Sequence, residues 1–197
     1  MEDHIIVVRG KTVDLAVVQE MYIPEIMHMI NDPRVAKFIT ARPPIYPAEE
    51  TEWLKNLEKN KNDVVFAVLL KKPEGGHEFL GIMGTHIRPK TNGVAVTGAI
   101  LKYDCLGKGY GSEAKMLQLF YAFRFLGLNK IRSTVLSINP RSKRYLEKAG
   151  YKVTGAFKDE DVRDGVPCDE IQLELFPKEW EEIWKNYKKK HNMKDPF

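Results

Sequence analysis

Three alternating glycines and a lysine form the segment of this chain that is best suited to binding a charged ligand. The segment reads Leu106-Gly107-Lys108-Gly109-Tyr110-Gly111-Ser112. Glycine lets the backbone approach a ligand closely and adopt conformations that other residues avoid. A helix is expected to begin here, and the unpaired N–H groups of a helix start attract anions, aided by the helix dipole. Because Lys108 adds a positive charge, we expect a phosphate or pyrophosphate to bind at this loop.

The glycine spacing separates the loop from two common nucleotide-binding patterns. A P-loop needs four residues between its first glycine and a Gly-Lys-Ser/Thr triplet, and that spacing is absent. The dinucleotide fingerprint has glycines at relative positions one, three and six, whereas here they fall at one, three and five. The acidic residue expected at the end of the next strand is also missing. A turn that merely tightens a strand–helix junction is the remaining alternative, and it would not need three glycines and a lysine.

The pattern of apolar and turn residues divides the chain into strands and helices around this loop. Strands are expected at 5–8, 12–18, 64–70, 79–87, 94–101, 131–138, 152–157 and 170–176. Helices are expected at 24–31, 47–59, 109–126, 140–149 and from 177 to about 190. Asp164-Gly165 is a hairpin turn pair between the last two strands. The unit from 94 to 138 should be a right-handed crossover between parallel strands. The expected fold class is therefore α/β in the mixed α+β sense, with a central mixed sheet and helices on both faces.

The composition is that of an ordinary globular protein, with 43% hydrophobic and 29% charged residues. We expect 1–197 to form a single domain that ends in a helix and basic tail at about 177–197. The sequence has no apolar window of about 20 residues, and its start does not resemble a secretory signal. A cytoplasmic location without a membrane partner is expected. The net charge is only +4, and a solvated helix end explains the terminal lysines better than a nucleic-acid-binding face does. Cys105 and Cys168 lack metal-ligand spacing, so no metal is expected.

The loop and four further segments resemble the GNAT superfamily of N-acetyltransferases. The family loop follows a Gln/Arg-x-x-Gly-x-Gly/Ala pattern, in which Gly109 and Gly111 match and Leu106 replaces the usual Gln or Arg. Within the superfamily the chain is most similar to the RimJ/RimL-type branch. The segments that carry this similarity are MINDPRVAKFI, YPAEETEWL, INPRSKRYLEKAGY and RDGVPCDEIQLELFPKEW.

The resemblance implies where acetyl-coenzyme A, the co-substrate, would bind. Strands 94–101 and 131–138 would start parallel and splay apart, with the pantetheine arm in the gap between them. The arm would pair with the backbone of the first strand, as an added strand does, and the pyrophosphate would rest on the loop amides. Asn139 would hydrogen-bond the arm and could also cap the helix at Pro140. The coenzyme-binding residues implied are Ala99, Ile100, Leu101, Leu106, Gly107, Lys108, Gly109, Tyr110, Gly111, Ser112, Asn139 and Ser142.

The reaction implied by the resemblance is direct attack of an amine on the acetyl thioester. The place of the family's frequent Glu base is Val96 here, and the place of its frequent Tyr acid is Leu146. Ser142 is the first catalytic candidate, as a hydroxyl that assists the leaving thiolate, and its alternative is helix-start chemistry. Tyr145 is the second, and its alternative is a core aromatic. Asp104 and Glu113 flank the loop and are expected to be solvated acids.

The apparent absence of a strong base bears on the acceptor. An α-amine with a pKa of about 8 is roughly one-tenth neutral at pH 7, whereas a lysine amine near 10.4 is neutral in under about 0.1%. The expected acceptor is therefore the N-terminal α-amine of a protein or peptide. A polyamine or other small amine is the first alternative, because the stretch from Asp159 to Asp164 is acidic. A non-catalytic acetyl-CoA-binding module is the second. The oligomeric state stays open, with a homodimer as one option.

Overall fold

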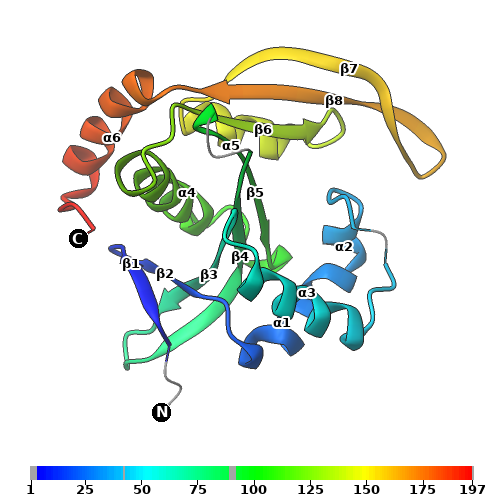
Figure 1. Ribbon diagram of the computed structural model, residues 1–197, viewed down its shortest axis with the longest axis horizontal. Helices are drawn as coiled ribbons and strands as arrows, with labels where there is room; N and C mark the ends of the chain where they lie inside the picture. Colours follow the sequence, from blue (N-terminus) through cyan, green and yellow to red (C-terminus); the bar gives the residue numbers. More distant parts are fainter. Residues whose placement is uncertain (1–3, 42, 89–91, 197) are drawn as a thin grey trace.

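The computed structural model describes residues 4–41, 43–88 and 92–196. One eight-stranded sheet runs through the molecule in the order β1-β2-β3-β4-β5-β6-β8-β7 (Figure 1). The strands are β1 Ile6–Arg9, β2 Val13–Val17, β3 Asp63–Lys71, β4 His77–Ile87, β5 Val94–Leu101, β6 Lys130–Leu136, β7 Lys152–Arg163 and β8 Val166–Leu175. Neighbours are antiparallel except β5 and β6, which are parallel. The predicted mixed sheet and parallel crossover are confirmed.

Helices cover both faces of this sheet (Figure 1). They are α1 Ile23–Asn31, α2 Pro33–Ala36, α3 Pro47–Lys59, α4 Tyr110–Phe120, α5 Pro140–Lys148 and α6 Pro177–His191. Successive side chains of a strand point to opposite faces, and β4 shows this directly. Ile82 packs in a cluster with Ile26 of α1 and Leu54 of α3, whereas Met83 packs with Leu117 of α4. The α1/α3 face and the α4 face are therefore distinct surfaces of the same strands.

The parallel pairing between β5 and β6 is short. It comprises Val94 with Lys130, Ala95 with Ile131 and Val96 with Arg132. One step further along, the Ser133 hydroxyl donates a hydrogen bond of 2.9 Å to the backbone oxygen of Thr97. The two strands then separate, as the resemblance predicted, and leave a gap beside the second half of β5.

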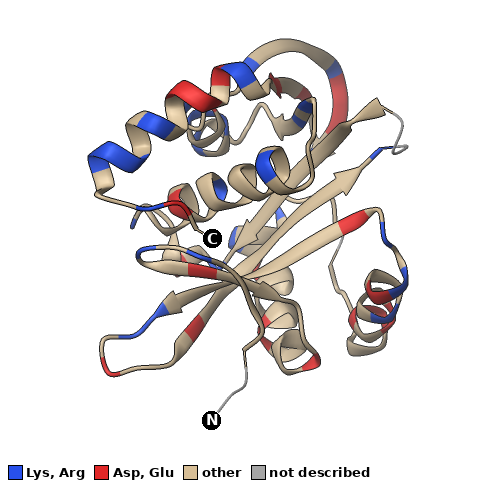
Figure 2. Ribbon diagram, turned by 60° about the vertical axis from the view of Figure 1, so that its left-hand side comes forward, with Lys and Arg blue, Asp and Glu red and all other residues tan. Residues whose placement is uncertain are grey.

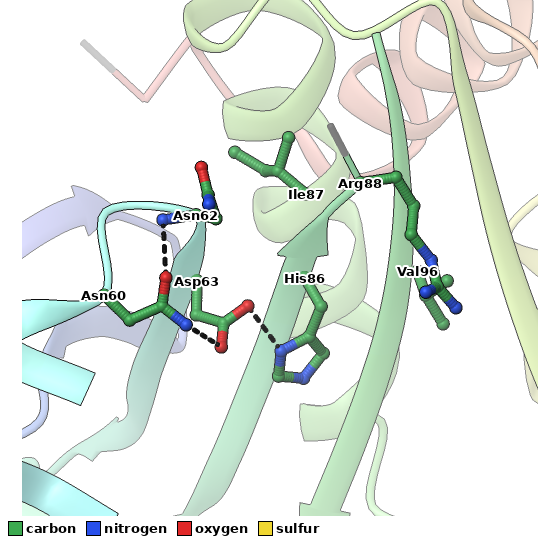
Figure 3. Close-up of a pocket in the computed structure, with 7 residues that line it drawn as sticks. All are labelled: Asn60, Asn62, Asp63, His86, Ile87, Arg88 and Val96. Carbon is green, nitrogen blue, oxygen red and sulfur yellow. Dashed lines mark hydrogen bonds and ion pairs between the residues drawn. The ribbon is translucent and has the colours of Figure 1, made fainter. Parts of the chain in front are cut away.

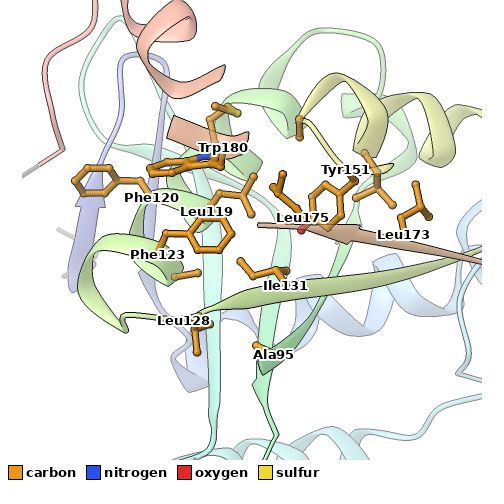
Figure 4. Packing of buried hydrophobic residues seen from close by; sticks show 14 of the residues in the cluster. Ala95, Leu119, Phe120, Phe123, Leu128, Ile131, Tyr151, Leu173, Leu175 and Trp180 are labelled. Carbon is orange, nitrogen blue, oxygen red and sulfur yellow. The ribbon is translucent and has the colours of Figure 1, made fainter. Parts of the chain in front are cut away.

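A separate apolar cluster lies on the far side of this gap. Trp180 of α6 is fully buried and packs against Phe120 and Phe123, with ring centroids 6.4 and 5.3 Å away (Figure 4). Leu173 and Leu175 of β8 and Ile131 of β6 complete the same cluster. α4 contributes to this cluster and also to the cluster under β2–β4, so it connects the two halves of the sheet.

The structure differs from the predicted elements most clearly at the last hairpin and at a short additional helix. The last hairpin is longer than expected, because β7 continues to Arg163 and β8 begins at Val166. The turn itself was predicted correctly: Asp164 and Gly165 have φ values of 51° and 76°, as a hairpin turn of this kind requires. The short helix α2 was missed; the Asp32 side chain caps it by accepting from the Arg34 N–H.

Other features follow the sequence patterns closely. The long helix expected at 109–126 is α4 followed by a single π-helical turn, Tyr121–Phe125, and Gly127 stops it with a φ of 63°. Acidic residues lie near the start of α6 and basic residues near its end, as the helix dipole favours (Figure 2). No helix among the described residues is long and apolar enough to cross a membrane.

Candidate active site

The glycine loop joins β5 to α4 and presents a free helix start. Gly107 and Gly109 have φ values of 80° and 89°, and no heavy atom lies within 4 Å of a Cβ built at either position. Gly109 is the N-cap of α4 and provides no side-chain cap. Across the described residues, no hydrogen bond is made by the backbone N–H groups from Gly107 to Gly111. Such a cluster of unpaired amides fits a pyrophosphate.

Three residues of the predicted loop set contribute differently from the others. The N–H of Leu106 is already bonded to the Tyr103 oxygen at 3.1 Å, and the N–H of Ser112 to the Gly109 oxygen at 3.0 Å. Gly111 lies within α4, where a Cβ would approach the Leu101 side chain to 2.8 Å. Its lack of a side chain therefore serves close packing between the helix and β5, and not an unusual backbone angle.

The backbone N–H and C=O groups of successive β5 residues point alternately toward β4 and toward the opposite edge, which faces β6 and then the gap. The Thr97 oxygen faces β6, since it accepts from Ser133, and the Lys102 N–H faces β4, since it donates to the Leu80 oxygen at 2.8 Å. Because the polar groups of successive residues point to opposite edges of a strand, Ala99 and Leu101 turn theirs toward the gap. Ile100 turns its own toward β4, where it lies opposite Ile82.

Asn139 and Ser142 lie across the gap, at the start of α5. The Asn139 side-chain oxygen accepts from the Ser142 N–H at 3.0 Å, which is the helix cap that the sequence allowed. The cap leaves the amide nitrogen of Asn139 for another partner. The Ser142 side chain is half-buried at this edge of the gap.

Tyr145, one turn further along α5, has a buried hydroxyl that lacks a hydrogen-bond partner among the described residues. Burial, reinforced by Tyr151, raises the pKa of this hydroxyl well above its ordinary value, so it stays protonated. The Lys115 amine of α4 lies 5.8 Å from the Tyr145 ring centroid and donates to Gln118 Oε1 at 2.7 Å. Lys115 is only 1% exposed, and this burial lowers its pKa to about 7. Leu146 is buried in the core.

A pocket of about 500 Å³ opens on the α1/α3 face, beside the paired start of β5 (Figure 3). Its lining residues are Asn60, Asn62, Asp63, His86, Ile87, Arg88 and Val96. His86 Nδ1 lies 2.9 Å from Asp63 Oδ1, and Asn60 Nδ2 donates to Asp63 Oδ2 at 2.8 Å. Val96, the place where the resemblance puts a carboxylate in many members, lies directly opposite His86.

This histidine–aspartate pair was not found from the sequence. Asp63 and His86 are 23 positions apart and belong to two different strands of the meander. The signal available was a polar residue at the start of β3 and another near the end of β4. Their pairing could be found only with the register between the two strands.

The acids flanking the loop have different environments. Asp104 is exposed, as expected, and pairs with Arg34 at 3.2 Å. The prediction that Glu113 is solvated was wrong: it is buried, and its Oε1 accepts from the Thr12 N–H at 2.7 Å. Glu113 thus ties the turn between β1 and β2 to α4. Groups of three or more His, Cys, Asp or Glu side chains arranged to hold a metal ion are absent from the described part of the chain.

Comparison with known proteins agrees with this geometry. Residues 15–152 match the acetyltransferase (GNAT) domain family. Over 157 residues the chain is 26% identical to the uncharacterized N-acetyltransferase p20 of Bacillus licheniformis, covering 76% of this chain and 84% of that protein. The spermidine N-acetyltransferase from Vibrio cholerae, solved with CoA and spermine, aligns with a TM-score of 0.80 at 17% identity, covering 87% of this chain and 99% of that one. A GCN5-related N-acetyltransferase from Brucella melitensis aligns with a TM-score of 0.74 at 22% identity, covering 92% of this chain and 83% of that one.

The sheet splays between β5 and β6, next to a glycine-rich helix start that has no side-chain cap. Together with the family match, this arrangement identifies an acyltransferase whose fold binds acetyl-CoA. The chain belongs to the GNAT acetyltransferase family and is an N-acetyltransferase. The two structural neighbours share its fold.

Proposed function

We propose that this enzyme transfers the acetyl group of acetyl-CoA to the N-terminal α-amine of a protein or peptide. The main support for acetyl-CoA binding is the run of unpaired backbone amides from Gly107 to Gly111 beside the gap. The pyrophosphate would rest on these amides and Lys108, with Tyr110 and Ser112 flanking it. The pantetheine arm would pair with the gap-facing backbone of Ala99 and Leu101. Asn139 would hold the arm from the other side.

The charges of the pocket beside the gap support an α-amine acceptor. Asp63 is the one carboxylate among the described residues that line it, and both of its oxygens already accept hydrogen bonds. Arg88 adds a positive charge to the same lining. A polyamine carries several positive charges and needs several free carboxylates, whereas a peptide N-terminus presents one amine followed by backbone. The similarity to the RimJ/RimL-type branch points the same way.

Within this proposal, Ser142 assists the leaving thiolate from the start of α5. Its side chain is half-buried, and its N–H donates to Asn139 at the start of the helix that follows β6. Tyr145 is the second candidate for this role. Its hydroxyl is protonated, as a proton donor must be, but it is buried and has no hydrogen-bond partner among the described residues. That burial favours Ser142.

A polyamine acceptor is the second candidate function. It is favoured by the spermidine N-acetyltransferase fold shared with the Vibrio cholerae enzyme and by the acidic turn end of the β7–β8 hairpin. Part of that acidity is neutralised, since Asp161 pairs with Arg163 at 2.7 Å. The exposed Asp159 and Asp164 remain available to a cation.

The test compares kcat/KM, by release of the coenzyme thiol, for three acceptors at one pH. They are a peptide with a free α-amine, an N-terminally blocked lysine peptide, and spermidine. We expect the α-amine peptide to be the best acceptor. A tenfold or greater advantage for spermidine, about 1.4 kcal/mol in the transition state, would establish the polyamine alternative. Absence of turnover with every amine, in a protein that binds acetyl-CoA, would indicate a non-catalytic binding module.

A further inference from the structure

His86 and Asp63 lie on the α1/α3 face of the sheet, close to the point where β5 stops pairing with β6. Asp63 is opposite His86 across β3 and β4, and His86 is opposite Val96 across β4 and β5. The next row on this face is Val65, Gly84 and Gly98. Both rows belong to the α1/α3 face, because Ile82 and Ile100, two positions further on, pack in the α1/α3 cluster.

The hydrogen bonds around Asp63 fix which nitrogen of His86 is free to accept a proton. Asn60 Oδ1 accepts from the Asn62 N–H at 3.0 Å, so Asn60 must turn its Nδ2 donor toward Asp63 Oδ2. Asp63 therefore accepts at one oxygen from Asn60 and at the other from His86 Nδ1. A carboxylate only accepts, so the neutral imidazole carries its proton on Nδ1 and a lone pair on Nε2.

Nε2 is directed along β4 toward Gly84, which is opposite Gly98 in the part of β5 beyond the pairing with β6. A Cβ built on Gly84 would lie 2.7 Å from it, so the imidazole occupies the space above this glycine. Opposed residues of antiparallel strands are about 4.5–5.5 Å apart at Cα, and the residue opposed to Gly84 is the exposed Gly98. Gly98 lies beyond Val96, the last residue of β5 that pairs with β6. The row between Nε2 and the gap therefore consists of glycines, whose lack of side chains leaves room for a ligand.

We propose that His86, positioned by Asp63, is the general base that removes the proton from the acceptor amine; this rests on the proposed acetyl transfer. The amine would lie over Gly98, with its nitrogen between His86 Nε2 and the thioester carbon in the gap. As the new N–C bond forms and the C–S bond breaks, the amine proton passes to Nε2 and the electron pair leaves with the thiolate. The thiolate takes up a proton, and the imidazolium returns its own to solvent.

Two charged side chains line the pocket together with His86: Asp63 of β3 and Arg88, the residue after β4. Asn60, the C-cap of α3, and Val96 of β5 are neutral. Asp63 stabilises the imidazolium as it forms, and Arg88 opposes the approach of an amine that is already charged. The pair therefore suits an acceptor that binds neutral or loses its proton easily, as an α-amine does.

The chain supplies a matched control for this proposal. His77, at the other end of β4, also pairs with an aspartate, since its Nε2 lies 3.0 Å from Asp14 Oδ2. We expect His86→Gln to lower kcat/KM for the best amine of the panel by about 100-fold or more. The same change at His77 should leave kcat/KM within about threefold. The acetyl-CoA-induced rise in melting temperature should be equal in both variants, which separates catalysis from folding and coenzyme binding.

Four further readouts distinguish a base from a structural histidine. Wild-type kcat/KM should rise with pH, because a general base must be unprotonated to act, and His86→Gln should lose that rise. Added imidazole should restore activity to His86→Ala. Asp63→Asn should lower kcat with little change in KM. In the enzyme without coenzyme, ¹⁵N NMR should show the proton of His86 on Nδ1.

The outcomes separate this proposal from the proposed function. Wild-type turnover combined with unchanged activity and an unchanged pH profile in His86→Gln would overturn the role of His86 alone. An Nε2-protonated tautomer would overturn the orientation by Asp63. Failure of the wild-type enzyme to acetylate any amine would overturn the proposed function, and the role of His86 with it.

Discussion

Gly107 and Gly109 show how single residues shape the coenzyme loop. Both have positive φ, and both have open space where a side chain would begin. A side chain at either position would be strained by the backbone and would also fill the space over the unpaired amides. The loop therefore depends on glycine for two separate reasons, and a variant can separate them.

Gly109→Val should abolish acetyl-CoA binding, and Gly75→Val is its control. Gly75 lies in the turn between β3 and β4, with a φ of 95° and open space around its Cβ position. Each variant should lose about 1–3 kcal/mol of stability through the same backbone strain. Only Gly109→Val should lose affinity in a calorimetric titration with acetyl-CoA. Equal affinity in the two variants would show that the loop does not hold the coenzyme.

The sequence identified the residues of this loop but not the pair opposite Val96, and the reason is a single bulge. Counting from the turn, Lys71 lies opposite His77, and the same register would place Asp63 opposite Thr85. The register shifts between Val68 and Leu69, beside Gly81, so that Asp63 meets His86 instead. A one-residue bulge is decided by local packing and twist. The alternation of apolar residues does not reveal it.

At the scale of elements, strands and helices with a buried face were predictable, and exposed ones were not. The ends of α3, β5 and α5 follow from capping residues and apolar runs. The outer part of β7 does not, since most of Lys158–Arg163 is exposed and charged, and its strand structure comes from pairing with β8. The burial of two polar residues of α4, Lys115 and Gln118, was also not predicted.

Lys115 makes the stability of the protein depend on pH. Its folded pKa is about 7 because burial disfavours the charged amine, whereas an unfolded lysine titrates near 10.4. Between these values the unfolded chain binds more protons, so stability rises with pH, by up to about 1.4 kcal/mol per unit. Below about pH 7 both states are protonated and the contribution is flat.

Lys115→Met should remove this rise between pH 7 and 10, as measured by urea unfolding. The loss of the Gln118 partner adds a pH-independent cost of about 1 kcal/mol. Lys185→Met, on the exposed side of α6, should keep the wild-type slope. A variant of Lys115 with an unchanged slope would mean that the amine is charged or solvated in the folded protein.

At the scale of the whole molecule, coenzyme binding should appear as added stability. A ligand present at 100 times its Kd stabilises the folded state by about 2.7 kcal/mol, which for a chain of this size raises Tm by roughly 5–10 °C. We expect such a rise with millimolar acetyl-CoA in differential scanning fluorimetry. The acetyl group itself should add little, since the loop and strand contacts belong to the coenzyme. An unchanged Tm in a folded sample would contradict the site.

Because β5 and β6 pair at only three residues, the second half of β5 has no partner strand on the side of the gap. Side chains of α4 pack against both half-sheets, so beyond the paired residues the halves are connected through this helix and not through the strands themselves. The amides of Ala99 and Leu101 lie in this unpaired part of β5, and without a partner strand they should exchange their hydrogens rapidly with solvent. A bound pantetheine arm would protect them and join the halves. The coenzyme would then act as the missing strand of the sheet. Hydrogen exchange at these two amides would be fast in the empty enzyme and slow in the enzyme that holds the coenzyme.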